Sequence, residues 1–490
     1  MAQVESVRGE AELEERQARL ALDLVEPGTD DGLQAERVSR ELPQGITSKM
    51  LYSDVARIAW PSLVELTLTQ LTSMVDLMMV GALGPWAITA VGLSVQPRFL
   101  SMILFQAMNV GATAMVARYR GAGQPERANE VLRQALFLSL ILALVCGAAG
   151  YVYSEKLIAF MGAEPETLAG GTVYLRIQML TLPIFALTST ITAALRGVGS
   201  TRIAMFYNVL ANVVNAVFNY LLIYGHFGFP RLEVAGASLA TSVGQVAAFI
   251  MAAVVILRGD HYLHFSFKGG FRPHWQHLRN IFNIGVPSML EQLAMRAGVI
   301  VYVRTVASLG TNAYATHQIG MNIQALSFMT GQAFAVSATS LVGQSLGKKR
   351  PDMAQSYSNH TRRLGLIISV ILGIAFFFFG EQIVSLYSRE PEIIAQGASI
   401  LKLVALTQPA QSSQFILAGA LRGAGDTRAT AVITFLTVML VRPYFAMLAV
   451  NVLGLGLAGA WYALVADQLL RSGLVLLRYR SGRWKNVRIK

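Results

Sequence analysis

Long apolar stretches, separated by short polar segments, run through almost the whole chain. Stretches of about 20 residues or more are long enough to cross a hydrocarbon core of about 30 Å as a helix, since a helix rises about 1.5 Å per residue. Strict two-residue alternation, the pattern of a membrane barrel strand, does not occur. The pattern therefore predicts an all-α membrane protein with twelve transmembrane helices, near residues 57–81, 87–117, 131–153, 168–195, 202–224, 234–257, 281–308, 313–345, 361–380, 394–421, 429–452 and 456–478.

The chain also contains a duplication with an offset of 226 residues. The segment Arg-Gly-Val-Gly-Ser-Thr-Arg at 196–202 returns as Arg-Gly-Ala-Gly-Asp-Thr-Arg at 422–428. Prolines and acids inside apolar stretches repeat with the same offset, which indicates two copies of one membrane unit. The matched positions include Pro61 with Pro287, Glu65 with Glu291, Gly84 with Gly310 and Pro183 with Pro409.

Six crossings per copy is an even number, so both copies enter the membrane from the same side. We expect two parallel six-helix lobes related by a pseudo-twofold axis along the membrane normal, with a central cleft between them. The predicted organisation is a cytoplasmic tail at 1–48, an N-lobe with helices 1–6 at 49–257, a cytoplasmic linker at 258–280, a C-lobe with helices 7–12 at 281–480 and a basic tail at 481–490.

Composition and charge support this interpretation. The chain is 54% hydrophobic and 14% charged, with a net charge of +12. Its basic residues gather in one set of loops, which places that set and both termini in the cytoplasm by the positive-inside rule and removes the need for a nucleic-acid partner. These residues include Arg118, Arg120, Arg127, Arg133, Lys348, Lys349 and Arg350.

Several other classes of function do not fit the sequence. The single cysteine, Cys146, excludes an internal disulfide and a multi-cysteine metal site. The helices carry no His-Glu-x-x-His motif or aspartate cluster of a membrane enzyme, so we expect no enzymatic activity and no cofactor. The Arg-Gly segments lie between apolar helices without a preceding strand, and we interpret them as short cytoplasmic turns rather than phosphate loops.

Several motifs together resemble the multidrug and toxic compound extrusion (MATE) family of cation-coupled antiporters. They are Pro61-Ser62, Val75-Asp76, the Gly84-Pro85 turn, the turn at 195–199, and the segments 215–220 and 236–241. The segments 285–292 and 315–319 look most like the damage-inducible-protein-F-like bacterial branch. The resemblance implies a monomeric carrier in the bacterial cytoplasmic (inner) membrane, in contact with lipids, that exports small amphipathic, often cationic compounds in exchange for inward H⁺ or Na⁺.

Asp76 is the first candidate for ion coupling, because an ionised carboxylate inside hydrocarbon is costly unless it faces a polar cavity. Asn215, Asn219 and Thr241 lie at a similar depth, and their oxygens suit Na⁺ or a proton-accepting aspartate. The resemblance implies that these four positions form the N-lobe cation or proton site, with Asn219 where some members have a second aspartate. The alternative is that Asp76 reaches the headgroups and that the asparagines pack helices.

Glu65 and Glu291 form a second candidate set, because each follows a repeat-equivalent proline by four residues. At matched depth, they are positioned to meet at the cleft and to bind substrate or carry protons. The alternative is structural: Arg296 lies on the same helix as Glu291, and Arg304 and Arg442 also lie at membrane depth, which makes that glutamate part of an ion-pair network in the C-lobe.

A rival transport function is a flippase or exporter for a lipid-linked or anionic amphipathic molecule. It requires several arginines along the cleft, and the candidates are Arg98, Arg296, Arg304 and Arg442.

Overall fold

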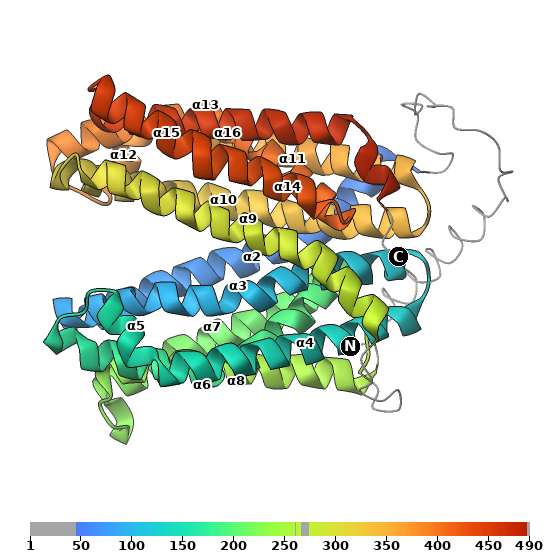
Figure 1. Cartoon of the computed structure of the whole chain (residues 1–490), viewed down its shortest axis with the longest axis horizontal. Coiled ribbons are helices and arrows are strands. Elements are labelled where there is room, and N and C mark those ends of the chain that lie inside the picture. The colour runs from blue at the N-terminus through green and yellow to red at the C-terminus, as the bar shows by residue number, and fades with distance from the viewer. Residues whose placement is uncertain (1–45, 260, 266–273, 488–490) are drawn as a thin grey trace, which may run out of the picture. The chain divides into compact units, whose positions relative to one another are not determined.

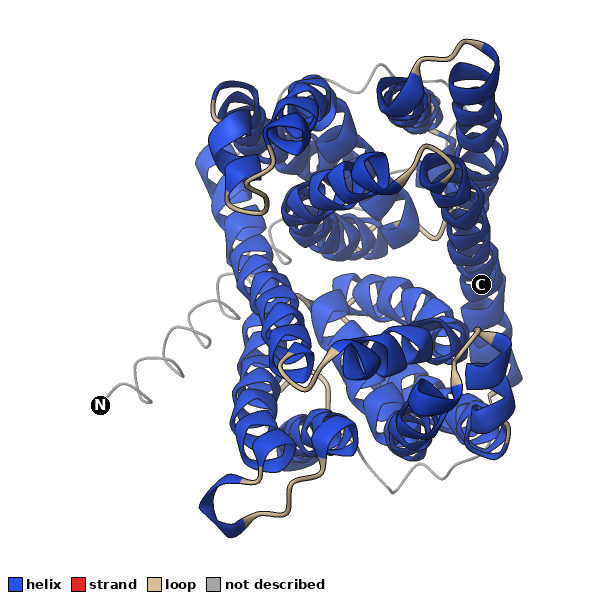
Figure 2. Cartoon of the chain, turned by 90° about the vertical axis from the view of Figure 1, so that its left-hand side faces the viewer, coloured by secondary structure: helices blue, strands red, loops and turns tan. Residues whose placement is uncertain are grey.

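The computed structural model describes residues 46–259, 261–265 and 274–487, and all regular structure within them is helical (Figure 2). Twelve segments are long and apolar enough to cross a membrane, as the hydrophobic pattern predicts. The elements are α2 (Ser48–Gly81), α3 (Pro85–Gly121), α4 (Pro125–Val152), α5 (Ser154–Phe160), α6 (Pro165–Val198), α7 (Thr201–Tyr224), η1 (His226–Gly228), α8 (Glu233–Arg258), α9 (Trp275–Ala307), α10 (Thr311–Gly347), α11 (Pro351–Phe378), α12 (Gly380–Ser385), α13 (Pro391–Gly423), α14 (Thr427–Thr434), η3 (Phe435–Val441), α15 (Arg442–Met447), η4 (Leu448–Val452), α16 (Gly456–Arg480) and η5 (Arg483–Asn486).

The helices extend beyond the apolar stretches that predict them. Helix α9 begins at Trp275 rather than 281, and α11 begins at Pro351 rather than 361. Their first turns carry polar residues, so hydropathy marks only the part of each helix that lies in hydrocarbon. The eleventh span is also irregular, because the wide π-helical turns η3 and η4 flank α15, which holds Pro443 near its start. Proline removes a backbone donor and crowds the preceding turn, and π-turns accommodate such a break.

The duplication is visible in matching hydrogen bonds. Thr201 Oγ1 donates to the carbonyl of Ile58 at 3.0 Å, and Thr427 Oγ1, 226 residues later, donates to the carbonyl of Ile284 at 2.8 Å. Each bond ties the start of the fifth helix of a lobe to the first helix. The repeat is therefore a repeat of three-dimensional contacts.

The Arg-Gly segments are short turns, as predicted. Gly199 and Gly425 occupy equivalent positions with φ of 87° and 86°, in the left-handed region where glycine has no steric penalty. Each turn joins two consecutive membrane spans, α6 to α7 and α13 to the span that begins with α14.

We call α2–α8 the N-lobe and α9–α16 the C-lobe, although α2 and α9 each contact both. The first half of α2 packs into the C-lobe, where Val55 and Ile58 are buried with Ala338 of α10. The first half of α9 packs into the N-lobe, where Ile281 is buried with Ala112 of α3. The two helices therefore cross between the lobes (Figure 1).

The crossing defines two ends of the helical body. We call the end at which α8 ends and α9 begins the linker end, and the opposite end, near α5 and α12, the far end (Figure 1). At the linker end, α3 and α10 approach each other through Gly121 and Gly347. A Cβ atom at position 121 would lie 1.9 Å from the carbonyl oxygen of Gln344, and one at 347 would lie 2.0 Å from that of Arg118. Only glycine permits this approach, and the two contacts are equivalent in the repeat.

Hydrogen bonds add to the closure of the linker end. Gln344 Nε2 donates to the carbonyl of Gly197 at 3.1 Å, and Arg118 Nη2 donates to the carbonyl of Ala424 at 3.4 Å. Each long helix thus binds the Arg-Gly turn of the opposite lobe. In this conformation the lobes are joined at the linker end.

Candidate functional site

A cavity of about 930 Å³ lies mainly within the N-lobe. It follows α2 from Glu65 to Val80, a length of about 22 Å at the helical rise. Apolar side chains such as Val91, Val95 and Val336 line it together with hydroxyl and amide side chains such as Thr192, Asn212 and Gln245. The C-lobe contributes Gln292, Gln332, Ala335, Val336, Thr339 and Arg422. The cavity can therefore accommodate an amphipathic molecule of drug-like size.

Asp76 lies in the far half of this cavity, half-buried on α2. Its Oδ1 accepts a hydrogen bond of 2.5 Å from Asn219 Nδ2 on α7. The opposite amide atom, Asn219 Oδ1, is buried and has no hydrogen-bond partner among the described residues. An unpartnered buried oxygen beside a carboxylate is suited to a cation or to a protonated group.

Asn215 and Thr241 complete this group, as the sequence predicts. Asn215 lies one turn before Asn219 on α7, and its side chain is within 3.1 Å of Thr241 Oγ1 on α8. The Asn215 amide can be oriented with its nitrogen 2.8 Å from Asp76 Oδ1 and its oxygen toward Thr241. Three helices of the N-lobe thus bring one carboxylate, two amides and a hydroxyl together.

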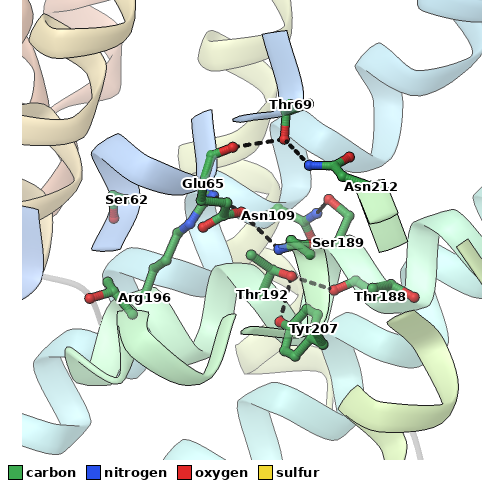
Figure 3. Close-up of polar contacts among 12 residues, drawn as sticks. Ser62, Glu65, Thr69, Asn109, Thr188, Ser189, Thr192, Arg196, Tyr207 and Asn212 are labelled. Atoms are coloured by element: carbon green, nitrogen blue, oxygen red, sulfur yellow. Dashed lines mark hydrogen bonds and ion pairs between the residues drawn. The ribbon is translucent and has the colours of Figure 1, made fainter. Parts of the chain in front are cut away.

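Glu65 lies at the linker-end side of the same cavity. Its Oε1 accepts hydrogen bonds from Arg196 Nη2 and Asn208 Nδ2, both at 2.7 Å, while its buried Oε2 has no partner among the described residues. Thr69, one turn further along α2, accepts a hydrogen bond of 3.2 Å from Asn212 (Figure 3). Glu65 is therefore paired within the N-lobe and still borders the cavity.

Glu291 has the equivalent partner in the C-lobe. Its Oε1 accepts a hydrogen bond of 2.7 Å from Arg422 Nη2, and Oε2 accepts one of 3.1 Å from Thr430. Arg422 lines the cavity and Glu291 does not, so the two glutamates do not face each other across it as expected. The structural alternative is therefore confirmed in that Glu291 forms an ion pair within the C-lobe, but its partner is Arg422 rather than Arg296. The Arg296 guanidinium instead lies over the ring of Phe99, 3.7 Å from its centroid.

The arginines proposed for an anionic cleft occupy different environments. Arg98 lines the cavity and forms no hydrogen bond with another described residue, whereas Arg442 is buried in the C-lobe against Asp467. The charged residues that line the cavity are Glu65, Asp76, Arg98, Arg196 and Arg422. Because Glu65 pairs with Arg196 and Arg422 pairs with Glu291, Asp76 and Arg98 carry the charges available to a ligand.

Asp467 is a buried acid that the sequence patterns above do not single out. It lies on α16 with no exposed surface, and its Oδ2 accepts hydrogen bonds from Arg442 at 2.5 Å and Arg471 at 3.4 Å. The available signal was a carboxylate and an arginine four residues apart inside the twelfth apolar stretch, since ionisable residues within membrane helices indicate function by default.

Comparison with known proteins gives consistent matches over nearly the whole membrane body. The MatE family model matches residues 61–221 and 287–448, and the starts of these two ranges differ by the repeat offset of 226. The chain is 30% identical over 433 residues to the probable multidrug resistance protein NorM of Thermotoga maritima, covering 88% of this chain and 93% of that protein. It is 28% identical to multidrug resistance protein PmpM of Pseudomonas aeruginosa, covering 80% and 83%.

Solved structures show the same fold at lower identity. An outward-facing multidrug resistance MATE family transporter superposes with a TM-score of 0.83 at 23% identity, covering 91% of this chain and all of that one. A transporter from Pyrococcus furiosus, described as having a binding pocket of reversed polarity, superposes with a TM-score of 0.82 at 24% identity, with coverage of 91% and 100%. The two-lobe arrangement of twelve helices is shared by these proteins.

Proposed function

Because the chain belongs to the MATE family of multidrug efflux transporters, which are not enzymes, we propose that it exports amphipathic compounds, cationic ones among them, in exchange for inward H⁺ or Na⁺. The observation that carries this proposal is the position of Asp76. Its carboxylate borders a large amphipathic cavity and has no ion-pair partner among the described residues.

Asp76, Asn215, Asn219 and Thr241 form the coupling site in this proposal. A proton on Asp76 or a Na⁺ ion beside it changes what the Asn219 amide can donate to, because that amide now donates to Asp76 Oδ1. Asp76 belongs to α2 and Asn219 to α7, so ion binding acts on the contact between these two helices. A cationic substrate in the same cavity competes for the same negative charge, which is the requirement for exchange.

The direction of transport follows from the topology we propose. The linker end carries most of the basic loop residues and faces the cytoplasm, with both termini on that side of a bacterial cytoplasmic membrane. The lobes are joined at this end through the contacts of α3 and α10, which supports an assignment of this conformation as closed to the cytoplasm. Rocking of the lobes against each other then exposes the cavity alternately to the two sides of the membrane.

A second candidate is export of an anionic amphipathic molecule, and Arg98 is the observation that favours it. Arg98 lines the cavity and forms no hydrogen bond with another described residue, so its guanidinium is available to an anionic headgroup. Arg296 and Arg442 give this candidate no support, because one covers Phe99 and the other pairs with Asp467.

The test is export of a cationic dye from vesicles in which the Na⁺ gradient and the proton gradient are collapsed separately. We expect Asp76→Asn to lose export driven by the active gradient and to bind the cationic dye more weakly, because it removes the negative charge for which dye and coupling ion compete. The matched control is Asp352→Asn, which removes a carboxylate that is paired with Arg350 at the linker end and does not line the cavity. Wild-type export by Asp76→Asn under both gradients contradicts the site. Unchanged export of an anionic amphipathic compound in Arg98→Gln contradicts the second candidate.

A further inference from the structure

A second charged cluster lies inside the C-lobe, away from the cavity. Asp467 Oδ2 accepts hydrogen bonds from Arg442 Nη2 at 2.5 Å and Nε at 3.0 Å, and from Arg471 Nη2 at 3.4 Å. All three residues are more than nine-tenths buried, with exposed fractions of 0%, 7% and 8% for Asp467, Arg442 and Arg471. Two guanidinium groups therefore share a single carboxylate oxygen within the membrane body.

This cluster has a surplus of positive charge. The neighbouring acid, Glu291, is itself paired with Arg422 at 2.7 Å. Together these groups comprise three arginines and two carboxylates, which leaves one positive charge without a counterion among them. An uncompensated charge in a membrane interior is strongly unfavourable, so a counterion is expected.

The cluster also has polar atoms without partners. Arg471 Nε is buried and donates to none of the described residues. Asp467 Oδ1 and Gln468 Oε1 are buried acceptors without a described donor. A small anion can accept a hydrogen bond from the unpartnered arginine donor, and water can donate to the two unpartnered acceptors. Apolar side chains packed against these atoms would leave the donor and the acceptors without partners.

The place of the cluster in the repeat explains why it can hold a ligand. The Gly-Ala pair at 236–237 near the start of α8 corresponds to the pair at 459–460 near the start of α16. The offset here is 223 rather than 226, because the connection before α16 is shorter. Two small cavity-lining residues of α8 thus correspond to charged residues of α16: Gly244 to Asp467 and Ala248 to Arg471. The region that receives a ligand in the N-lobe is charged and polar in the C-lobe.

We propose that the Arg442–Asp467–Arg471 cluster binds a small inorganic anion, for which chloride is the probe. The anion balances the surplus arginine charge and stabilises the packing of α15 and α16. This site goes beyond the exchange proposed for the N-lobe cavity, and it requires neither the drug nor the coupling ion.

The experiment is thermal melting of the purified full-length protein in detergent, titrated with sodium chloride against sodium gluconate at constant total Na⁺. Because a ligand that binds only the folded state stabilises it in a saturable manner, we expect the melting temperature to rise by several degrees with chloride and then to level off. Bromide should replace chloride. Arg471→Gln removes the surplus charge and should abolish the chloride effect. Arg304→Gln, which changes a C-lobe arginine in the last turn of α9 whose side chain forms no hydrogen bond or ion pair with another described residue, should retain it.

Equal melting temperatures in chloride and gluconate for the wild type overturn the proposal, as does an unchanged chloride effect in Arg471→Gln. If that variant does not fold, Asp467→Asn provides the second test. It removes the carboxylate that competes with the anion and should lower the chloride midpoint by at least several-fold, and an unchanged midpoint refutes the site. The readout is binding, so loss of dye export in other variants leaves this result unaffected.

Discussion

The contact between α3 and α10 at Gly121 makes the strongest prediction for the transport cycle. A methyl group at position 121 would lie 1.9 Å from the carbonyl oxygen of Gln344, and an ordinary contact requires about 3.4 Å. Gly121→Ala can therefore be accommodated only if the two helices separate by about 1.5 Å. The separation also stretches the bond from Gln344 to Gly197, which is 3.1 Å long.

Gly121→Ala should destabilise the conformation that is closed at the linker end. Overpacking of a tight contact costs about 1–3 kcal/mol. The contact joins the lobes only where the linker end is closed, so Gly121→Ala should shift the ratio of closed to open states by about 5- to 150-fold toward open. In the isolated helix the same substitution is favourable by up to about 1 kcal/mol. A loss of closure therefore cannot be attributed to a weakened helix.

The assay is labelling of a single cysteine at Thr113, which lines the cavity near its linker-end side, in a background without Cys146. A membrane-impermeant maleimide is applied from the linker side, and the labelling rate reports how often that side opens. We expect faster labelling in Gly121→Ala. The control is Gly92→Ala on the same helix, where an added Cβ would meet no atom within 4 Å.

Equal labelling rates in Gly121→Ala and Gly92→Ala would refute the reasoning. Gly347→Ala supplies an independent repeat of the test, because its Cβ would lie 2.0 Å from the carbonyl oxygen of Arg118. The two variants should act in the same direction, since their contacts are equivalent in the duplication.

Three further predictions follow from contacts of the described residues. Glu65→Gln should destabilise the protein by about 3 kcal/mol in thermal melting, because it leaves Arg196 without its carboxylate, and the double variant with Arg196→Gln should lose less. Asn219→Asp places a second carboxylate beside Asp76, so Na⁺ should raise the melting temperature of this variant more than that of the wild type; an identical Na⁺ response would contradict the proposed cation site. Trp484→Ala removes a fully buried side chain at the linker end and should cost about 3–5 kcal/mol, measured by denaturant or thermal unfolding.

The twelve membrane helices could be predicted from the sequence because each must present a continuous apolar surface to lipid. The repeat offset also predicted the paired prolines and the Arg-Gly turns. It could have predicted more: Glu65 and Arg196 are separated by 131 residues, and so are Glu291 and Arg422. Acids and arginines that repeat in register are candidates for pairs within each copy. The interpretation that the two glutamates meet at the cleft was wrong because depth in the membrane does not determine which side of a helix faces the cavity.

The group of polar residues around Asp76 could be predicted from the sequence for a different reason. Asn215 and Asn219 lie one turn apart on the same side of α7, and their depth matches that of Asp76, so helix periodicity and topology together bring them close. The closed linker end could not be predicted from the sequence. The approach of α3 to α10 depends on particular glycines, and nothing in the sequence distinguishes them from the others in a chain with 43 glycines.

Asp467 shows how a small change of register alters what a duplication predicts. Under the single offset of 226, Asp76 corresponds to Tyr302, and Asp467 on α16 corresponds to Thr241 on α8. The connection before α16 spans 453–455, whereas the one before α8 spans 225–232, and this difference moves the register of the last helix. With the corrected register, Asp467 corresponds to Gly244, which borders the N-lobe cavity.

The two lobes therefore keep the same frame of helices and hydrogen-bonded turns but differ on the face that can hold a ligand. One lobe presents small residues and one available carboxylate, while the other presents two arginines around a buried carboxylate. If ions are coupled in the N-lobe as proposed, while the C-lobe holds a fixed charge cluster, the effects of substitutions in the two lobes should be separable.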